Sequence, residues 1–342
     1  MQLAPRKEKI LASVIETYIR TGEPVGSKLL QTDFGINASS ATIRNELAEL
    51  TSYGLLIQPH TSAGRVPTDR GYRYYIDKLM VDKSLSQVAK EHIYQRMLKD
   101  VTSPEGILKT ATELISEITH SVAIATTPDG KRARVHRINF VPVGRYTAMV
   151  VLITSTGMVK TSLFRCDFVI TPELLAVFDK ALNRELVGCP LTEITPPFMQ
   201  TLAASFGELT LFIPNVLLAI SDIVKEATVS TVEIAGKMNI LSLPEISVES
   251  GKGILNFLNS NKAISLISEQ SRDLRVLIGL ESGIGELADM SMLISQYDIA
   301  GQKAGVIATL CHKRVDYSSR LAIIEYIAQI SSKLMNELVA ND

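Results

Sequence analysis

Apolar residues recur at helical spacing along the first fifty residues of the chain. Apolar positions three or four residues apart run through residues 6–20 and again through 40–50, and a shorter apolar stretch lies at 23–30. Such spacing places the apolar side chains on one side of a helix. Residues 33–36 contain Asp and Gly, which are turn residues. The pattern therefore predicts three short helices in succession, with a turn before the third.

The third predicted helix has two sides of different character. Ile43, Leu47 and Leu50 fall at i, i+4 and i+7 and form its apolar stripe. The opposite side is small or polar, and consists of Ala41, Asn45 and Ala48 with Thr42 and Arg44 on the flanks. Small residues let a helix approach a surface closely, and Thr, Arg and Asn side chains can read base edges in a DNA major groove. Taken alone, this stretch is equally consistent with an ordinary surface helix.

The residues after the third helix change what it predicts. Residues 55–66 predict two short strands joined through Ser62-Ala63-Gly64-Arg65, which places a cation at a hairpin tip, where it can meet phosphate or the minor groove. Helix, helix, turn, helix and hairpin follow one another in the order of a winged helix-turn-helix domain. We therefore expect a DNA-binding domain of this kind at residues 1–80.

Arginines follow the predicted hairpin. Thr68-Asp69 can start a further helix with tyrosines on one side and Arg70 and Arg73 near the other. The two arginines either hold DNA backbone beside the hairpin or are solvated, and the pattern favours neither. The tyrosines are expected to pack against the domain, because readers of duplex DNA rarely need base stacking. Residues 81–102 predict a polar linker helix.

The rest of the chain predicts an α+β, multidomain protein. Four strand-like runs between 121 and 165, after an amphipathic helix, predict an antiparallel sheet with that helix on one side. Helical patterns then dominate 173–227, before strand patterns return at 274–310 and a last helix follows. We expect one α+β domain made of residues 103–170 and 250–342, interrupted by an insertion at 171–249.

A family resemblance is carried by the run SSATIRNELAEL…GLLIQPHTSAGRVPTDRGYRYYID, which resembles the N-terminal region of HrcA, the bacterial heat-inducible transcription repressor family. Weaker similarity continues through VEIAGKMNIL and GVIATLCHKRVDYSS. The last segment departs from the family, because residues 310–313 stand where a Gly-Pro-Thr-like run precedes Arg-x-Asp-Tyr. We expect that departure to touch the regulatory half and to leave the DNA-reading half unaffected.

The resemblance implies a specific architecture and set of partners. It implies a GAF-like α+β domain that carries an inserted dimerisation domain. It also implies a homodimeric repressor that binds double-stranded DNA at an inverted-repeat operator upstream of chaperone genes, with a GroEL-type chaperonin as the partner that keeps it competent. A two-fold dimer presents two recognition helices to two half-sites, which matches a palindromic target.

Composition limits the alternatives. The 342 residues include 35 Lys and Arg and 36 Asp and Glu, so the near-neutral chain is not expected to coat nucleic acid indiscriminately, although a few cations suffice for a site-specific reader. The three cysteines are scattered and fit reduced, buried thiols of a cytoplasmic protein. The N-terminus has no apolar signal core, and the most apolar run, 209–220, is too short for a membrane helix. If that run is exposed, it would make the insertion marginally stable and dependent on a chaperonin.

Catalysis is not expected. The five histidines form no metal-ligand spacing, and no phosphate-binding, dinucleotide or nucleophile-elbow motif is present, so we predict neither an enzyme nor a cofactor or metal. The basic run at 131–137 has two interpretations. It is either a second nucleic-acid patch or, as we favour, a charged hairpin edge that discourages aggregation.

The predicted DNA contacts fall into three groups. We expect Thr42, Arg44 and Asn45 at base edges, Ser39 and Ser40 at phosphate near the helix start, and His60, Ser62 and Arg65 on the wing, with Arg70 and Arg73 beside it. Two alternatives remain open. One is a winged-helix regulator controlled by a small effector in the GAF-like domain, and the other is an adaptor that uses the winged fold to bind protein.

Overall fold

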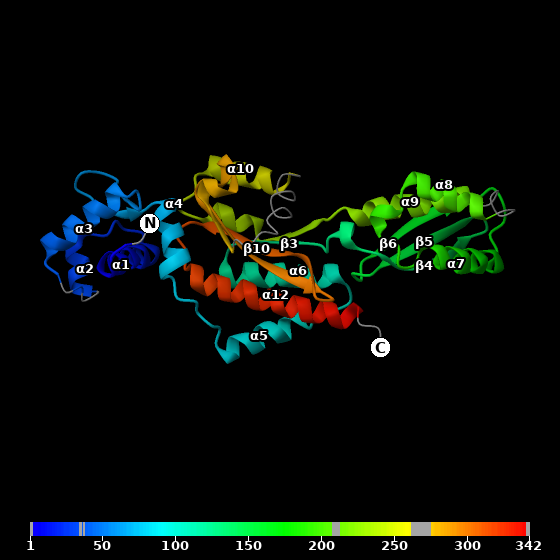
Figure 1. Cartoon of the computed structure of the whole chain (residues 1–342), viewed down its shortest axis with the longest axis horizontal. Helices are drawn as coiled ribbons and strands as arrows, with labels where there is room; N and C mark the ends of the chain where they lie inside the picture. Colours follow the sequence, from blue (N-terminus) through cyan, green and yellow to red (C-terminus); the bar gives the residue numbers. More distant parts are fainter. Residues whose placement is uncertain (1–2, 34–35, 37, 207–212, 261–274, 340–342) are drawn as a thin grey trace.

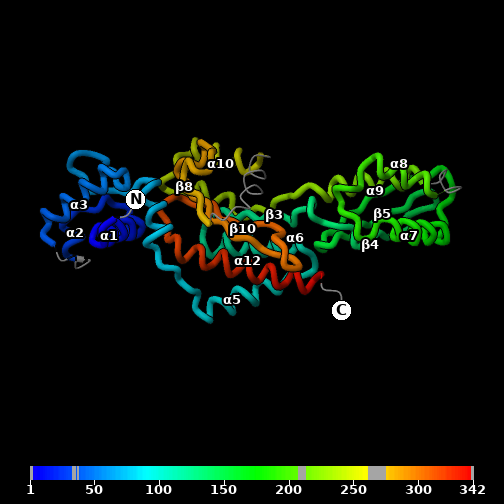
Figure 2. The backbone as a smooth tube through the Cα atoms, in the orientation of Figure 1, coloured from blue at the N-terminus to red at the C-terminus, as the bar shows by residue number. Residues whose placement is uncertain are grey.

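A computed structural model of the chain describes residues 3–33, 36, 38–206, 213–260 and 275–339. The molecule is elongated, and Figure 1 shows three bodies in a row: N-terminal helices at one end, a central body of sheet and helices, and a second sheet with its own helices at the other end. The tube in Figure 2 shows that the chain passes from the first body to the second, enters the third, and returns to the second. The fold is thus of mixed helix and sheet with several bodies, as expected.

The N-terminal body contains three helices and a two-stranded ladder. Its elements are α1 (Pro5–Thr21), α2 (Ser27–Asp33), α3 (Ser40–Ser52), β1 (Leu56–Ile57) and β2 (Val66–Pro67). Helix α1 ends where Gly22 adopts a left-handed φ of 74° and its N–H bonds to the carbonyl of Tyr18. The strands are antiparallel, with Leu56 opposite Pro67. The helices and strands predicted for this region are present in the predicted order.

Two helical segments follow the ladder and lead into the central body. They are α4 (Asp69–Tyr74), which runs directly into the π-helical turn η1 (Tyr75–Leu79), and α5 (Gln87–Met97). Tyr72 and Tyr75 are buried, so the prediction that these tyrosines pack within the protein is confirmed. Helix α5 is shorter than the linker helix predicted at 81–102. It contacts helices of the central body and buries Ile93 and Met97, so it is not a free-standing linker.

The central body is a five-stranded antiparallel sheet between two helical layers. Its strands are β3 (Val122–Thr126), β7 (Val232–Ala235), β8 (Val276–Ile278), β9 (Met290–Ile299) and β10 (Gln302–His312), in the order β7-β3-β10-β9-β8. Helices α6 (Pro104–Thr119) and α12 (Tyr317–Val339) contribute to the hydrophobic cluster on one face of the sheet. Helix α10 (Val248–Leu258) covers the other face, where Phe257 packs near Met292.

The third body is a separate three-stranded sheet covered by helices. It contains β4 (Val135–Gly144), β5 (Thr147–Thr154) and β6 (Val159–Arg165), with α7 (Pro172–Leu186), α8 (Pro196–Ser205) and α9 (Pro214–Thr228). Short 3-10 turns, η2 (Gly130–Arg132) and η3 (Leu191–Glu193), lie where this body joins the central one. Its hydrophobic cluster runs from Ala133 to Ala227 and is distinct from both clusters of the central body.

The prediction that the four strand-like runs between 121 and 165 form one sheet is wrong. Strand β3 pairs with β7 and β10 in the central sheet, whereas β4, β5 and β6 pair only with one another. The chain leaves the central sheet after Thr126 and returns beside it at Val232, and the Thr127 N–H donates to the carbonyl of Thr231 at 2.9 Å. The sheet therefore places the insertion at 127–231, so the predicted bounds of 171–249 are corrected at both ends.

The apolar run at 209–220 is only partly visible. Residues 209–212 lie outside the described residues, but Ile213, Val216, Leu217 and Ile220 are buried where α9 packs on the three-stranded sheet. The expectation that this run is exposed is wrong for these four residues, because the three-stranded sheet of the insertion covers the side of α9 on which they lie. No helix of the described part is both long enough and apolar enough to cross a membrane. All three cysteines are free thiols; Cys166 and Cys311 are buried, as expected, but Cys189 is only partly buried, so the expectation of burial is wrong for it. Burial raises the pKa of Cys311 to about 11.

Candidate nucleic-acid interface

Helix α3 is anchored from behind by its apolar stripe. Ile43, Leu47 and Leu50 are buried and belong to the same hydrophobic cluster as Leu11 and Val14 of α1. The three residues predicted to form the apolar stripe are therefore the ones that pack against the rest of the domain. Burying three aliphatic side chains fixes the rotation of α3 about its axis, and with it the direction in which the opposite side faces.

The opposite side of α3 is open. Ala41, Arg44, Asn45 and Ala48 are all exposed. The side chains of Arg44 and Asn45 form no hydrogen bond or ion pair with any described residue. This surface therefore combines small residues, which allow close approach, with one guanidinium and one carboxamide that are free to bond a ligand.

The start of α3 is held by hydroxyl groups. Ser39 is the N-cap, since its Oγ accepts from the N–H of Thr42 at 3.1 Å and lies 2.9 Å from the Thr42 hydroxyl. The Ser40 Oγ lies 3.0 Å from the Oγ of Ser27 on α2, and this bond ties the two helices together. The hydroxyls of Ser39, Ser40 and Thr42 can each form a further hydrogen bond, but all three already take part in bonds that stabilise the start of α3.

A buried carboxylate that the residue pattern does not predict also fixes α3. Glu46 is buried on α3, and its Oε1 lies 2.7 Å from Arg6 Nε and 2.6 Å from Arg6 Nη2. Its other oxygen, Oε2, is buried without a hydrogen-bond partner in the described part. The hydrogen bond that Arg6 donates to Glu46 raises the pKa of Arg6. Because a buried unpaired carboxylate is costly, the pair holds α3 against α1.

The loop between β1 and β2 presents polar groups to solvent. The amide nitrogen of Gln58 donates to the carbonyls of Thr61 and Ala63, at 2.9 and 3.0 Å, and closes the loop on itself. His60 and Ser62 are exposed at its end, and neither side chain has a bonding partner among described residues. These two of the three predicted wing residues are therefore accessible.

Arg65 does not lie at the hairpin tip, so that part of the prediction is wrong. Its N–H and carbonyl pair with those of Val25 at 2.9 Å each, which places Arg65 at the base of the loop beside α2. Its side chain is half-buried, and Nε donates to the Thr51 hydroxyl at 3.0 Å. The tight approach also restricts Gly64, because an added Cβ would lie 2.5 Å from the carbonyl of Val25.

Arg70 and Arg73 have different surroundings. Arg70 is exposed and has no ion pair within the described ranges. Arg73 donates to the Glu281 carboxylate through Nε at 3.0 Å and through Nη2, to the Val276 carbonyl at 2.6 Å, and to Asp77 at 3.2 Å. Arg73 is therefore not a solvated arginine, and it joins the N-terminal body to the central sheet.

The segment after β10 also contacts the N-terminal body. Lys313 Nζ lies 2.9 Å from Asp69 and 3.5 Å from Asp289, and Arg314 donates to the Ile19 carbonyl at 3.2 Å. Lys313, one of the unusual residues 310–313, therefore contacts the region predicted to bind DNA, through Asp69. Arg73, Lys313 and Arg314 form what we call the junction cluster.

Two titratable groups beside the junction cluster, Glu245 and His312, have shifted pKa values. Burial alone would raise the pKa of Glu245, but hydrogen bonding from Arg314 outweighs it and places that pKa below its ordinary value. Burial lowers the pKa of His312, whose Nδ1 accepts from the N–H of Arg314 at 3.1 Å. No group of three or more His, Cys, Asp or Glu that could hold a metal occurs in the described part.

Comparison with known proteins identifies the family. Residues 105–320 match the model of the HrcA protein C-terminal domain. The heat-inducible transcription repressor HrcA of Acetivibrio thermocellus is 32% identical, over 100% of this chain and 99% of that protein. The protein of the same name from Moorella thermoacetica is 33% identical, over 99% of each.

One solved structure has the same fold. A crystal structure described as that of a hypothetical protein has a TM-score of 0.67 and 24% sequence identity, covering 98% of this chain and 100% of the other. This likeness concerns the fold alone. The sequence matches extend over the full length of the named relatives, and the chain belongs to the HrcA family of heat-inducible transcription repressors.

Proposed function

We propose that this protein is a repressor of chaperone operons that binds an inverted-repeat operator as a homodimer, through a winged helix-turn-helix domain at residues 1–80. One observation carries the proposal: the free side chains of Arg44 and Asn45 lie on the exposed, small-residue side of α3. The resemblance of this region to the repressor family and the printed names of the relatives support the same conclusion.

Helix α3 has the features of a major-groove helix. Arg44 can pair with a guanine through two hydrogen bonds, and Asn45 can pair with an adenine in the same way. Ala41 and Ala48 add little bulk, so the backbone can approach the base edges closely. Thr42 can contribute to base contacts only from the flank, since its hydroxyl already bonds Ser39.

The remaining predicted residues are assigned to the DNA backbone. Ser39 and Ser40 are placed at a phosphate near the start of α3, where helix N–H groups favour an anion. The exposed His60, Ser62 and Arg70 contact the flanking backbone. Arg65 reaches phosphate from the base of the wing, beside α2. Arg73 is withdrawn from this set, because its guanidinium is occupied by Glu281 and Asp77.

The homodimer is proposed to form through the insertion. Paired strands place one set of side chains on the face of the β4–β6 sheet that does not pack against α7 and α9. Six apolar residues share that face, namely Val141, Met149, Val151, Ile153, Val159 and Leu163. Leu163 is 63% exposed, and none of the six belongs to the cluster of the insertion. Arg137, Asn139 and Thr161 lie on the same face. An exposed sheet face that is largely apolar fits a second copy related by two-fold symmetry.

The central body is proposed to be the GAF-like domain, and a GroEL-type chaperonin to be the partner that keeps the repressor competent. The support for the chaperonin is the resemblance together with the heat-inducible role in the names of the relatives. The three-layer arrangement of α6 and α12, the sheet, and α10 is compatible with a GAF-like domain.

Gel retardation tests the proposed function directly. Purified full-length protein is titrated into an inverted-repeat duplex from upstream of a chaperone operon, and separately into a scrambled duplex of equal length and composition. We expect retardation of the inverted repeat at concentrations at least a thousandfold lower, as is typical of specific readers. Equal retardation of both duplexes would refute sequence-specific reading, and retardation of neither would favour the adaptor alternative.

A further inference from the structure

A cavity that the proposed DNA-binding function does not use lies where the insertion meets the central body. A cavity of about 820 Å³ opens between the end of β3, the start of β10, the turns η2 and η3, and the ends of α8 and α9. Two chain segments, 127–134 and 228–231, cross beside it from one body to the other. The volume lies within the range of sites that bind small molecules.

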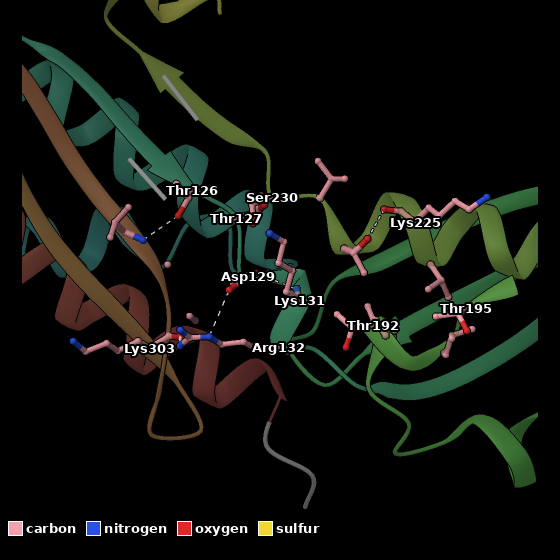
Figure 3. A pocket seen from close by; sticks show the side chains of 18 of the residues that line it. Thr126, Thr127, Asp129, Lys131, Arg132, Thr192, Thr195, Lys225, Ser230 and Lys303 are labelled. Atoms are coloured by element: carbon pink, nitrogen blue, oxygen red, sulfur yellow. Dashed lines mark hydrogen bonds and ion pairs between the residues drawn. The ribbon is translucent and has the colours of Figure 1, made fainter. Parts of the chain in front are cut away.

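The wall of this junction cavity is basic. Four of its lining residues are cations, Lys131, Arg132, Lys225 and Lys303, and its one carboxylate is Asp129. Figure 3 shows Lys131 and Arg132 between the strand side, with Thr126 and Lys303, and the helix side, with Thr192 and Thr195. Lys225 extends away from the others and pairs with Asp222 at 3.7 Å.

The cations differ in how far they are already neutralised. Asp129 lies 3.5 Å from Arg132 Nε, and Arg132 also donates to the carbonyl of Lys303 at 3.3 Å. The ammonium groups of Lys131 and Lys303 have no ion pair or hydrogen bond within the described part of the chain. The exposed Lys131 is therefore an uncompensated cation beside Arg132, which Asp129 partly compensates, whereas the side chain of Lys303 extends outward at the rim in Figure 3.

Hydroxyl and apolar groups complete the lining. The hydroxyls of Thr192 and Ser230 have no bonding partner among the residues described, so they are available as donors. Aliphatic side chains also line the wall, and include Leu191, Ile194, Val224 and Val306. Ammonium groups and hydroxyls bind oxyanions, whereas aliphatic walls bind the uncharged part of a ligand.

We propose that the junction cavity binds a small organic molecule that carries an oxyanion, either phosphate or carboxylate, and an apolar portion. Lys131 binds the oxyanion, with Lys303 adding charge at the rim and Thr192 and Ser230 donating hydrogen bonds. For Lys131 and Arg132, we propose this role in place of the nucleic-acid patch and the charged hairpin edge considered for the basic run 131–137. Lys131 and Arg132 lie in η2 at the cavity, whereas only 135–137 lie on the edge strand β4.

A bound ligand would link the two bodies. Thr126 and Lys303 belong to the central sheet, and Thr192 belongs to the insertion, so one molecule would contact both. The crossing beside it is already tight, because a Cβ on Gly130 would lie 1.9 Å from the carbonyl of Ala227. Ligand binding therefore fixes the angle between the bodies. The consequence for DNA, a change in the spacing of the two α3 helices, rests on the dimer and operator proposed above.

Isothermal titration calorimetry on the full-length protein tests the site, with three probes at constant ionic strength. Adenosine monophosphate supplies a phosphate, citrate supplies carboxylates, and adenosine supplies the apolar portion without an anion. We expect saturable binding of adenosine monophosphate or citrate, the better of the two identifying the oxyanion, and much weaker binding of adenosine. Absence of saturable binding by both anions would overturn the proposal.

Matched variants separate the cavity from general surface charge. Lys131→Glu should weaken anion binding by roughly tenfold to a hundredfold, because it removes a charge-assisted hydrogen bond. Lys180→Glu makes the same charge change on the exposed surface of α7 and should leave affinity unchanged. Ser230→Tyr, which fills space without changing charge, should also weaken binding. Equal affinity in the wild type, Lys131→Glu and Ser230→Tyr would overturn the site.

Gel retardation of DNA and calorimetry of anion binding are separate measurements, so the two proposals can fail independently. Lys131→Glu protein without ligand should still retard the inverted-repeat duplex, because Lys131 lies between β3 and β4, far along the molecule from α3 (Figure 1). Anion binding without any specific retardation would uphold the cavity and refute the proposed repressor function. Specific retardation without anion binding would do the reverse.

Discussion

The contact between Arg73 and Glu281 gives a sharp test of how the N-terminal body is held. Glu281 accepts two hydrogen bonds from Arg73, which also donates to the carbonyl of Val276 beside it. Glu281→Gln keeps the shape of the side chain but removes its charge and leaves the guanidinium with a neutral acceptor. We expect the N-terminal body to detach more often from the central sheet.

The magnitude follows from the exposure of the two side chains. A hydrogen bond to a charged group contributes about 1.5–3 kcal/mol where water is excluded. The Arg73 side chain is 22% exposed and that of Glu281 35%, so solvent screens part of the interaction. We therefore expect Glu281→Gln to lower the local opening free energy by about 1–2 kcal/mol, the lower part of what a partly screened pair can supply.

Hydrogen–deuterium exchange measures this opening. Amides of α4 and η1 should exchange roughly 5–30 times faster in Glu281→Gln than in the wild type, as an opening free energy lower by 1–2 kcal/mol requires. Glu117→Gln is the matched control. It removes the carboxylate that Arg96 holds through two hydrogen bonds, at 2.9 and 3.4 Å, between α5 and α6. Unchanged exchange at 69–79 in Glu281→Gln, or equal acceleration there in the control, would refute the role of the pair.

Three further predictions concern the core, the pH dependence and the wing. Leu50→Ala should lower the free energy of unfolding by about 2–5 kcal/mol in chemical denaturation, because Leu50 is fully buried behind α3; a loss below about 1 kcal/mol would contradict that anchoring role. His312 has a folded-state pKa below its ordinary 6.5, so the stability it contributes is present above pH 6.5 and is lost as pH falls through the folded pKa. His312→Asn should therefore flatten the fall in unfolding free energy as pH drops below 6.5, and an unaltered slope would show that His312 does not titrate with unfolding. Arg65→Ala should weaken binding to all duplexes and reduce the salt slope by about one unit, whereas an unchanged slope would show that Arg65 never reaches phosphate.

The sequence predicted the N-terminal elements well because local spacing determines them. Ile43, Leu47 and Leu50 repeat with the helical period, and the same three residues are buried in the structure. The position of Arg65 was not predictable in this way. Its placement depends on backbone pairing with Val25, forty residues earlier, and on the closed loop that Gln58 holds.

Features that depend on distant parts of the chain escaped the sequence pattern. Alternation of apolar and polar residues predicts a strand but not its neighbour, so nothing local showed that β3 pairs with β7 rather than with β4. Lys313 and Asp69 are 244 positions apart, and their ion pair has no local signal. The junction cavity also combines residues from five separate segments of the chain.

The central claim is that the exposed side of α3 reads bases. The most direct measurement compares dissociation constants of wild-type, Arg44→Ala and Arg20→Ala proteins for the inverted-repeat and scrambled duplexes at one salt concentration. Arg20 is an exposed cation at the end of α1, so its substitution matches the charge change away from α3. Loss of an arginine–guanine pair should make the binding free energy of the Arg44→Ala protein about 1–3 kcal/mol less favourable for the inverted-repeat duplex. Its affinity for the scrambled duplex should hardly change. Equal weakening on both duplexes, or the same behaviour in Arg20→Ala, would contradict the account.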